Sequence, residues 1–421
     1  MPVGSTSFLR TCSPWRRSKP STMKVLLVAD YTNNNQQSIR RYAALMQRGL
    51  EEAGHDVRLV RPPVLLGRLC RGETGFGKWI GYFDRYILYP PLLRWQARWA
   101  DVVHICVDPI YIQHLRRKPH VFTCHDILPI KAALGEIEES RPGWTGRLYQ
   151  RWSLYCIRRA MFVVCVSKQT WRDVRRIARL PGECIAVVEN SLNYPYRPME
   201  RSDALARLRR LDVDEPFLMH VGGNQWYKNR TGVLKIFAEL VKKPSYERHR
   251  LVMVGKPLTD GMKQLAAQLG LKDHLYELVS VSNEDLRALY SMATALIFPS
   301  LQEGFGWPII EAQACGCPVI TTGRPPMKDV GGDAAIYIDP EDVTGSVDVI
   351  CRDLGESAEN LRLKGYRNAA RFAPKAMISK YLDCYKSVLD RGGIGKFDGQ
   401  GPEEGRKAII EGLALASWRR R

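Results

Sequence analysis

The amino-acid sequence predicts an α/β fold in which two Rossmann-like domains face each other across a cleft. The chain has 421 residues, enough for two or three domains with cores of their own. Its composition, 45% hydrophobic and 25% charged, is that of a folded protein and excludes intrinsic disorder for most of the chain. From Met23 onward, short apolar stretches alternate with helical ones in two series. Strands that alternate with helices form right-handed βαβ units, so each series predicts one parallel sheet.

The first series begins directly after Met23 with a continuous apolar strand, of the kind that is buried in parallel sheets. Residues Gln37–Ala53 have the periodicity of an amphipathic helix that ends at Gly54. The strands of this series are expected at 24–29, Asp56–Val60, Val102–Val107, Val121–Cys124, Phe162–Val166 and Ile185–Glu189.

The second series is separated from the first near residues 190–215, where prolines and a basic helix at Ala204–Arg210 suit a hinge. Two helices, Glu356–Phe372 and Lys375–Leu389, close the globular part on either side of Pro374. The strands of this series are expected at Phe217–Val221, Leu251–Val254, Ala295–Phe298, Pro318–Thr321 and Ala335–Ile338. The predicted units are a tail (1–22), an N-terminal Rossmann-like domain (23–195), a C-terminal Rossmann-like domain (196–373), a closing helix (374–390) and a flexible tail (391–421).

Residues 1–22 are rich in Ser, Pro and Arg and lack the apolar core of a secretory signal. Met23 is a candidate start, with an over-extended gene sequence before it, and a transit peptide is the alternative. No apolar run approaches the roughly 18–20 residues that span a bilayer, which argues against an integral membrane protein. The 11 cysteines include no CxxC pair, as is typical of reduced core thiols in a cytosolic protein.

The net charge of the chain is +19, and the basic excess lies in its N-terminal half. This charge could meet an anionic membrane, a phosphorylated substrate or a nucleic acid, and its magnitude does not choose among them. Two stretches in this half, 94–99 and 147–152, have Arg and Trp at helical spacing. The spacing suits helices at the interface of an anionic membrane, and equally suits solvated helices with aromatic residues in the core.

The segment 299–320 is the most informative part of the sequence, because a Gly-containing loop leads directly into a helix. Gly304 and Gly306 let a ligand approach the backbone closely, and Pro308 fits the first helical position. Free N–H groups and the positive end of the helix dipole at this point suit a diphosphate.

Two carboxylates belong to this segment, Glu303 on the loop and Glu311 one turn into the helix. Both can face one cleft, where one would hold a hydroxyl-rich sugar and the other a ribose diol; the alternative is that both meet solvent. The run EGFGWPIIEAQACGCPVI, which starts at Glu303, resembles the carboxyl-terminal signature of the family-4 glycosyltransferases. Members of this family adopt the two-domain GT-B fold and retain the anomeric configuration, and many build bacterial polysaccharides or glycolipids.

The resemblance implies a role for each residue of the signature. Glu303 would contact the donor sugar near the reacting carbon, and Glu311 would accept hydrogen bonds from the ribose. The backbone at Gly304, Phe305 and Gly306 would approach the sugar and the phosphates of the donor.

A second segment, Phe217–Asn229, reads as a strand, a glycine turn and a lysine just before a helix. A lysine there is a point charge that can neutralise phosphate, although the pattern by itself is equally common on protein surfaces. The segment resembles the first loop of the family's donor domain, which implies donor contacts from Gly223, Asn224 and Lys228. Relatives often carry a further arginine in this loop, for which Asn224 or Arg230 could substitute.

A third segment is a strand that ends in His125 and Asp126. A lone histidine at a strand end is more often structural, but the family's His-Asp pair at this place faces the donor sugar, which implies a catalytic role for His125. Asp126 would orient the histidine or cap the next helix.

Three further segments bear on ligand binding. Residues 30–35 replace the glycine-rich loop of many relatives with asparagines, which could serve the donor phosphate or the acceptor. Residues 72–79 resemble a P-loop except that Trp79 stands where Ser or Thr must bind magnesium, so we expect a basic loop. The Asp-Val-Asp run at 212–214 has the form of a metal-binding DxD but falls in the predicted hinge, so no metal is expected.

The sequence therefore predicts a metal-independent glycosyltransferase without a cofactor, whose co-substrate is a GDP-mannose or UDP-sugar type donor. Its acceptor would be a glycan or a lipid-linked glycan, and the enzyme would be cytoplasmic, in contact with the inner face of the membrane. The competing hypotheses are a sugar-nucleotide epimerase of the same fold and a basic nucleic-acid-binding protein, although no nucleic-acid motif is present.

Overall fold

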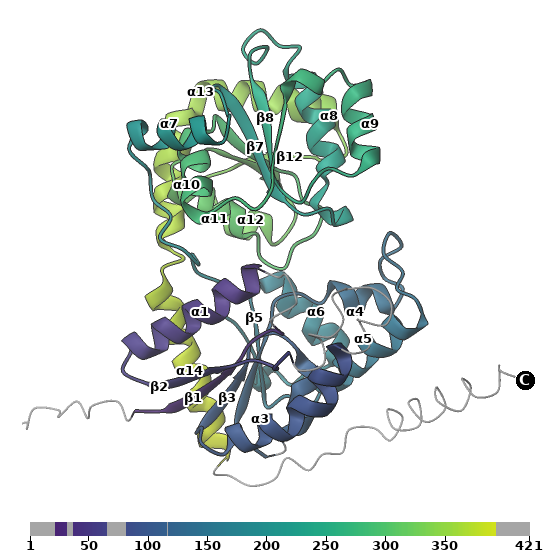
Figure 1. The fold of residues 1–421 in the computed structure, drawn as a ribbon, viewed down its shortest axis with the longest axis vertical. Helices are drawn as coiled ribbons and strands as arrows, with labels where there is room; N and C mark the ends of the chain where they lie inside the picture. The colour runs from purple at the N-terminus through teal and green to yellow at the C-terminus, as the bar shows by residue number, and fades with distance from the viewer. Residues whose placement is uncertain (1–21, 32–36, 65–80, 116, 393–421) are drawn as a thin grey trace, which may run out of the picture.

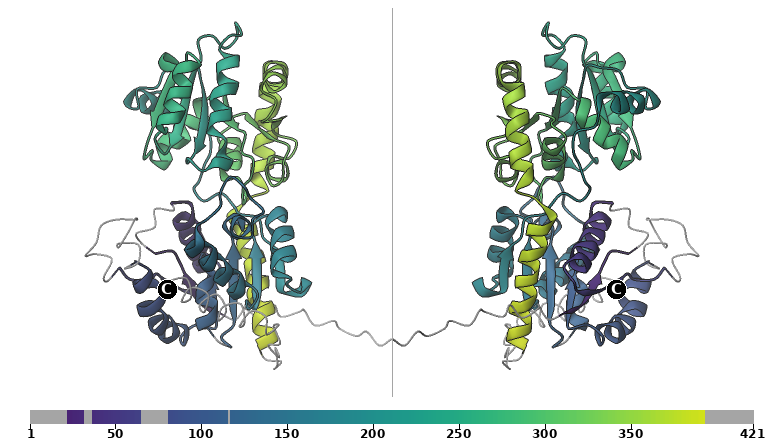
Figure 2. Two further views of the ribbon diagram at one scale, coloured as in Figure 1. Left: turned by 90° about the vertical axis from the view of Figure 1, so that its right-hand side faces the viewer. Right: turned by 90° about the vertical axis from the view of Figure 1, so that its left-hand side faces the viewer.

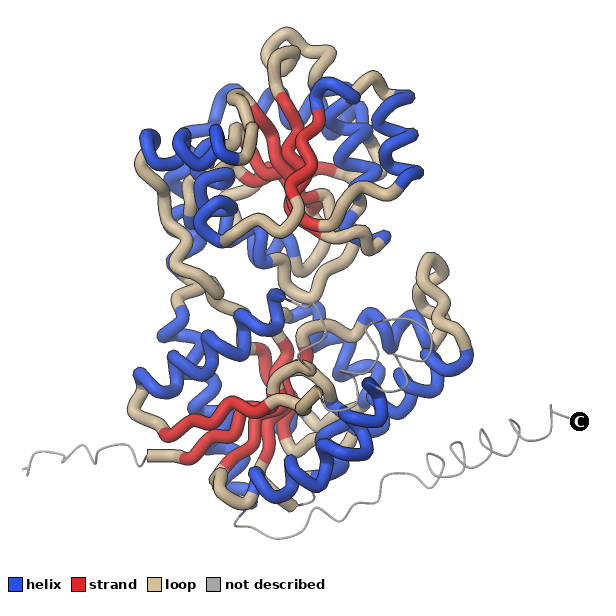
Figure 3. The backbone as a smooth tube through the Cα atoms, in the orientation of Figure 1, coloured by secondary structure: helices blue, strands red, loops and turns tan. Residues whose placement is uncertain are grey.

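The structure, a computed structural model, describes residues 22–31, 37–64, 81–115 and 117–392, which form two lobes (Figure 1). Residues 1–21 and 393–421 of the two predicted tails, most of the asparagine loop at 30–35 and the basic loop at 72–79 lie outside these residues. Each lobe is built around one parallel sheet with helices on both of its faces (Figure 3). The predicted fold class, two Rossmann-like domains, is confirmed.

The sheet of the first lobe has six strands in the order β2-β1-β3-β4-β5-β6. Every neighbouring pair is parallel, and β1, β3, β4 and β5 have almost entirely buried residues. The continuous apolar runs of the sequence have this pattern because both faces of each strand are covered. The strands are β1 (Lys24–Val28), β2 (Asp56–Val60), β3 (Val102–Ile105), β4 (His120–Cys124), β5 (Phe162–Cys165) and β6 (Ile185–Val187).

The sheet of the second lobe also has six parallel strands, in the order β12-β11-β10-β7-β8-β9. Strand β9 was not predicted, because this edge strand is only half-buried and has Tyr276 and Glu277 between its two leucines, which interrupts the apolar run. The strands are β7 (Phe217–Gly222), β8 (Arg250–Gly255), β9 (Leu275–Leu278), β10 (Ala295–Phe298), β11 (Val319–Thr322) and β12 (Ile336–Ile338).

The helices fill the connections between strands, as βαβ units require. Helix α7 is not a free hinge, because Leu208 belongs to the second lobe's core and Arg207 pairs with Asp285 of α10 at 2.7 Å. The helices are α1 (Gln37–Glu52), α3 (Tyr89–Ala97), α4 (Leu128–Ala133), α5 (Trp144–Ile157), α6 (Lys168–Ala178), α7 (Arg201–Arg210), α8 (Arg230–Leu240), α9 (Asp260–Gln268), α10 (Asn283–Met292), α11 (Trp307–Ala314), α12 (Met327–Gly331), α13 (Val343–Ala370) and α14 (Pro374–Gly392).

The last two helices connect the lobes. Helix α13 begins at Val343, well before the predicted Glu356, because the side chain of Asp342 caps it by accepting a hydrogen bond from Gly345 N at 2.9 Å. After the break at Pro374, α14 leaves the second lobe and runs along the first (Figure 2). There it packs against α1 and β4, and its apolar face belongs to the first lobe's core.

Buried hydrogen bonds fix α14 to the first lobe. The Tyr381 hydroxyl bonds to the Tyr42 hydroxyl at 2.7 Å and to Thr123 at 2.9 Å, and Tyr385 bonds to His104 at 2.7 Å. His104 also bonds to Thr123 at 2.8 Å. Because buried polar groups are costly to leave unpaired, this network ties the end of the second lobe to β3, β4 and α1 of the first.

The topology of each sheet defines where a ligand is expected. In an open parallel sheet, a ligand binds at the carboxyl ends of the strands, where the strand order reverses. This point lies between β1 and β3 in the first sheet and between β7 and β10 in the second. No helix within the described residues combines the length and the apolar composition that crossing a bilayer requires.

Candidate active site

The loops after β7 and β10 are joined at the switch point of the second sheet. Leu301 N donates to the Tyr227 carbonyl at 2.7 Å, and Asn229 Nδ2 donates to the Pro299 carbonyl at 3.2 Å. Asn229 also caps α8 by accepting from Gly232 N at 3.1 Å. These bonds fix the two loops relative to each other, so the side chains that they carry have defined positions.

Those side chains form an ion pair that the sequence did not predict. Lys228 Nζ lies 2.7 and 2.9 Å from the two carboxylate oxygens of Glu303. The side chains are 18% and 8% exposed, so the pair is largely shielded from water. A shielded pair is held together strongly, and losing one partner leaves an uncompensated charge. The predicted phosphate ligand and the predicted sugar ligand therefore neutralise each other in the free protein.

Helix α11 begins beside this pair. Gly306 precedes it with a φ of 102°, which glycine adopts without strain, and no side chain caps the helix. Trp307 takes the first position, so Pro308 is the second helical residue and not the first as predicted. Phe305 is buried against Trp307 and Phe372, which fixes the turn. The uncapped helix start therefore keeps backbone N–H groups and a positive dipole end for an anion.

Glu311 lies inside the protein, so the alternative in which it meets solvent is wrong. It is almost fully buried and accepts a hydrogen bond from the Tyr290 hydroxyl at 3.1 Å. Burial raises the pKa of Glu311 to about 7, an effect opposed by the positive charge of Arg41 and by hydrogen bonds. Since Arg41 belongs to α1 of the first lobe, Glu311 faces the boundary between the lobes.

His125 directly follows β4 on the opposite side of this boundary. Its Nε2 lies 2.9 Å from the Cys106 carbonyl, which can only accept, so Nε2 carries the proton. Burial lowers the pKa of His125 to about 4, so the ring is neutral at pH 7. Its buried Nδ1 then presents a lone pair that has no partner among the described residues. Tyr42 packs edge-on against the ring with centroids 4.7 Å apart, which fixes its orientation.

Asp126 follows the histidine and serves the next helix. Its Oδ1 accepts a hydrogen bond from Leu128 N at 3.1 Å, at the start of α4. The cap position of α4 is Ile127, so this bond is that of an Asx turn leading into the helix, and Asp126 itself is not the cap.

The two lobes touch where the loop that carries Glu303 meets the first lobe. A Cβ atom on Gly304 would overlap the carbonyl oxygen of His125, so only glycine permits this approach. The Thr170 hydroxyl donates to the Gly304 carbonyl at 3.3 Å, and Trp307 Nε1 donates to the Ser191 carbonyl at 3.0 Å. Three contacts thus bring His125 and Glu303 to the same boundary.

The glycine turn after β7 holds the remaining predicted donor ligands. Gly223 is half-buried, and the exposed Asn224 donates to the Pro257 carbonyl at 2.8 Å. Arg230 is only 2% exposed and donates to Asn224 and, at 2.8 Å, to the Lys256 carbonyl. In this structure Arg230 is therefore buried and bonds to residues of the neighbouring loops, and its guanidinium is not exposed as a second phosphate ligand would be.

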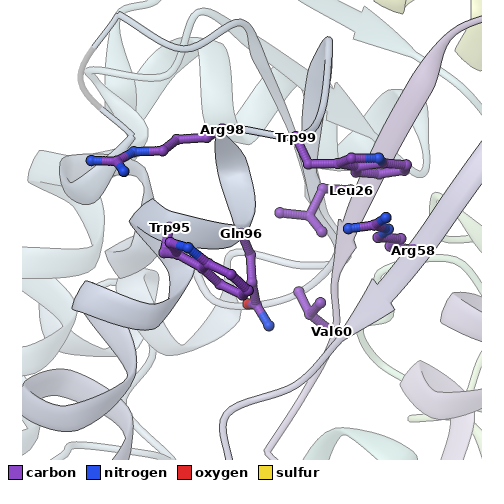
Figure 4. Close-up of a pocket in the computed structure, with 7 residues that line it drawn as sticks. All are labelled: Leu26, Arg58, Val60, Trp95, Gln96, Arg98 and Trp99. Atoms are coloured by element: carbon purple, nitrogen blue, oxygen red, sulfur yellow. The ribbon is translucent and has the colours of Figure 1, made fainter.

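The surface of the protein has two notable hollows, one between the lobes and one on the first lobe. One of about 330 Å³ spans the lobes, with Glu136 and Glu138 on one side and Trp226 and Gln302 on the other. The other, of about 320 Å³, lies between β1, β2 and α3 of the first lobe (Figure 4). Neither hollow is lined by a predicted site residue. The hollow between β1, β2 and α3 is lined by Leu26, Arg58, Val60, Trp95, Gln96, Arg98 and Trp99.

Sequence reasoning missed residues that contribute to the site from a distance. Tyr42 and Arg41 are adjacent on α1, and nothing in an amphipathic helix pattern indicates that one contacts His125 and the other acts on Glu311. Tyr381 reaches the site through Tyr42, although it is more than 300 positions away in the chain. The sequence signal that could have indicated this contact is the pair Tyr381 and Tyr385, which lie one turn apart in the closing helix.

Two facing Rossmann-like sheets, of which the second carries a lysine–carboxylate pair and a helix start beside the boundary between the lobes, have the arrangement of a GT-B glycosyltransferase. Two family patterns match the chain: Glycosyltransferase Family 4 over residues 39–194 and Glycosyl transferases group 1 over residues 204–369. The chain belongs to the family-4 glycosyltransferases.

Several curated relatives are glycosyltransferases. The chain is 25% identical over 306 residues to O-antigen chain mannosyltransferase B of Escherichia coli, covering 71% of this chain and 78% of the relative. It is 30% identical over 255 residues to O-antigen chain mannosyltransferase RfbU of Salmonella typhimurium, covering 59% and 64%. D-inositol 3-phosphate glycosyltransferase of Nocardia farcinica is 30% identical over 242 residues, and the match spans about half of each protein (54% and 51%).

Solved structures share the fold at low sequence identity. Sucrose-phosphate synthase from Thermosynechococcus elongatus superposes with a TM-score of 0.69 and 18% identity, over 88% of this chain and 100% of that one. Anabaena Alr3699/HepE in complex with UDP and glucose gives 0.66 and 16%, over 87% and 100%. WaaG, a glycosyltransferase involved in lipopolysaccharide biosynthesis, gives 0.60 and 18%, over 88% and 99%.

The contact at Gly304 generates a prediction about closure. We expect Gly304→Ala to lower glycosyltransferase activity by at least about 100-fold, because the methyl group would separate Glu303 from His125. The thermal midpoint should change little, since the overlap lies between the lobes. Small-angle X-ray scattering should show a larger radius of gyration.

Gly261→Ala is the matched control, because a Cβ there meets nothing within 4 Å. Full activity of Gly304→Ala, or an unchanged radius of gyration, would show that this contact does not limit closure.

Proposed function

We propose that the protein moves a sugar from a nucleotide-diphosphate sugar to a hydroxyl group of a glycan or lipid-linked glycan. The donor would bind to the second lobe and the acceptor to the first. The observation that carries the proposal is the Lys228–Glu303 pair beside the uncapped start of α11, at the switch point of the second sheet.

Each group of the site has a use in this reaction. The diphosphate would lie at the start of α11, where the N–H groups and Lys228 stabilise the charge that develops as it leaves. Lys228 has three N–H donors, so it can bind phosphate and keep one bond to Glu303. Glu303 and the free Nδ1 of His125 would accept hydrogen bonds from sugar hydroxyls, and Glu311 would accept from the ribose.

The transfer itself exchanges one bond for another at the anomeric carbon. The acceptor oxygen bonds to this carbon, the bond from this carbon to the diphosphate oxygen breaks, and the hydroxyl proton passes to the departing diphosphate. Contact between the lobes would exclude water, so that the acceptor hydroxyl and not water reacts.

We propose a mannosyl donor of the GDP-mannose type in preference to a UDP-sugar, because two relatives are O-antigen mannosyltransferases. Retention of the anomeric configuration is proposed from the family resemblance, and NMR of the product would test it.

Metal independence is proposed because Lys228 and the helix start supply the positive charge. The DxD run instead lies at the amino end of β7, away from the cleft, where Asp214 accepts from Tyr276 at 3.4 Å. Activity should therefore survive EDTA.

The donor proposal predicts a selective response to nucleotide sugars. In a thermal-shift panel of GDP-, UDP-, ADP- and dTDP-sugars, GDP-mannose should raise the unfolding temperature most.

Lys228→Met should lower kcat/KM by about 100–1,000-fold, because the variant lacks the ammonium group that stabilises the negative charge on the leaving diphosphate.

Lys235→Met, on the exposed face of α8, is the matched control. A donor that is converted to its epimer without any acceptor would identify an epimerase instead and contradict the proposal.

Burial of Glu311 predicts a pH dependence of donor affinity. Ribose hydroxyls donate to the ionised carboxylate, so binding favours the charged form of a group whose pKa is about 7. The dissociation constant of the nucleotide sugar should be flat above pH 7 and rise by up to about tenfold for each pH unit below it. Isothermal titration calorimetry between pH 5.5 and 8.5 would measure this. Glu311→Gln should bind more weakly and without the slope; a slope that survives this change would assign the titration to another group.

Membrane contact is proposed for one surface of the first lobe. Phe83, Ile87 and Trp95 lie at spacings of one or two turns on the helical stretch 81–97, and Trp95 is 66% exposed. Helix α5 packs beside this stretch through Tyr86 and Trp152, and adds Trp144, which is 67% exposed. Exposed arginines at 94, 98, 147 and 151 surround these residues, and this charge favours an anionic bilayer as the partner.

This surface predicts salt-sensitive binding to anionic vesicles. The double variant Ile87→Ser/Trp95→Ser should bind phosphatidylglycerol vesicles at least about tenfold more weakly than the unmodified protein in a sedimentation assay. Leu363→Ser, at an exposed leucine of α13, is the control. Equal binding of the double variant, or binding that is insensitive to salt, would contradict the assignment.

A further inference from the structure

The switch point of the first sheet carries a second cluster of polar and aromatic side chains. It lies at the carboxyl ends of β1 and β3, the place that corresponds to Lys228 and Glu303 in the second sheet. Tyr31 follows β1 and Asp108 follows β3. We call the half-buried side chains at this point the switch-point cluster: Arg85, Tyr86, Asp108 and Tyr149.

Hydrogen bonds hold the cluster in one arrangement. Asp108 Oδ2 accepts from the Tyr86 hydroxyl at 2.6 Å and from the Tyr149 hydroxyl at 3.2 Å, and its Oδ1 accepts from Ile110 N at 3.0 Å. The two hydroxyls are 2.9 Å apart. A carboxylate fixed in this way orients two phenol rings, which is more order than a solvated surface requires.

Arg85 is placed among the rings, and no carboxylate of the described residues forms an ion pair with it. Its guanidinium carbon is 4.9 Å from the ring centre of Tyr82, 5.3 Å from Tyr31 and 5.4 Å from Tyr86. Its Nε donates to the Gly81 carbonyl at 3.1 Å, while its terminal nitrogens have no hydrogen-bond acceptor among the described residues. The side chain is held in place by the rings and keeps donors for a ligand.

The chemistry of the cluster fits an uncharged sugar. A pyranose has an apolar C–H face that packs on aromatic rings, and hydroxyls that donate to a carboxylate and accept from a guanidinium. The charges of Arg85 and Asp108 oppose each other, and the nearby Asp84, which accepts from Tyr31 at 3.1 Å, adds no positive charge. A phosphate or a uronate would need an excess of cations here.

The cluster is also at the right distance from the proposed reaction centre. Strand β4, which His125 directly follows, is two strands from β1 in the sheet, a separation of about 10 Å. The Cys106 carbonyl that binds His125 is two residues before Asp108 in the chain. A single sugar ring over the cluster would therefore bring one hydroxyl toward His125 and the donor.

We propose that the switch-point cluster is the acceptor subsite and that it binds a neutral pyranose of the acceptor glycan. This inference rests on the proposed function and adds the residues and the class of acceptor. It assigns Arg85, Asp108 and Tyr149 to acceptor affinity and gives them no part in donor binding.

The experiment separates acceptor binding from donor binding. Saturation-transfer NMR would measure binding of methyl α-mannoside, methyl α-glucoside, methyl α-galactoside and mannose 6-phosphate to the GDP-loaded protein. Hydrolysis of GDP-mannose without acceptor would report the donor site. We expect an uncharged glycoside to bind, and Asp108→Asn and Tyr149→Phe each to weaken it at least about tenfold while donor hydrolysis stays within about twofold.

Asp101→Asn is the matched control, since Asp101 precedes the same strand at its opposite end and is exposed. The inference is overturned if both variants bind the glycoside as the unmodified protein does, if mannose 6-phosphate binds more tightly than every neutral sugar, or if no neutral sugar binds at all. Failure of the unmodified protein to bind or hydrolyse any nucleotide sugar would instead overturn the proposed function. Because Tyr149→Phe removes a single hydroxyl, it keeps the test informative if Asp108→Asn does not fold.

Discussion

The contact between Gly304 and the His125 carbonyl is the constraint on which the rest of the site depends. Each lobe could fold around its own sheet, but neither contains a complete set of ligands. Only where the loop after β10 meets the end of β4 do Glu303 and His125 reach one boundary. Thr170 and Trp307 hold this meeting point with bonds that cross between lobes. The site is thus a property of how the lobes are arranged, and a change at one glycine backbone alters it.

The fold could be predicted because buried parallel strands have a distinctive sequence. Both faces of β1 and β5 are covered, so Leu26 and Val164 stand in continuous apolar runs between helical segments. Strand β9 lacks this signal, since one side of an edge strand is exposed and can carry Glu277. The early part of α13 was missed because Val343, Thr344 and Gly345 are poor helix formers, and the cap of Asp342 and the packing on β12 outweigh their propensity.

The parts of the site that lie next to each other in sequence could be predicted, and those assembled by tertiary contacts could not. Glu303 and Glu311 share one segment, and Lys228 lies in the loop that follows β7, so pattern and resemblance both indicate them. The Lys228–Glu303 pair joins positions 75 residues apart, and periodicity in one segment does not specify its partner in another. Likewise, Arg230 could be chosen as a phosphate ligand from its charge and position, but only the structure shows that its guanidinium lies beneath the turn.

The charges of the site are all compensated before a ligand arrives, and this bears on how selectivity can arise. Lys228 is paired with Glu303, Glu311 is near its pKa at neutral pH, and His125 is uncharged. A ligand that offers only negative charge would have to separate the lysine from its carboxylate, which costs the energy of a shielded pair. In the proposed complex a nucleotide sugar would offset that cost, because its phosphates would take over part of the hydrogen bonding of the lysine while its hydroxyls would bond to Glu303, Glu311 and His125. Inorganic phosphate can bond to Lys228 but has no sugar or ribose hydroxyls for Glu303, Glu311 and His125. The site should therefore bind a complete nucleotide sugar more tightly than phosphate alone.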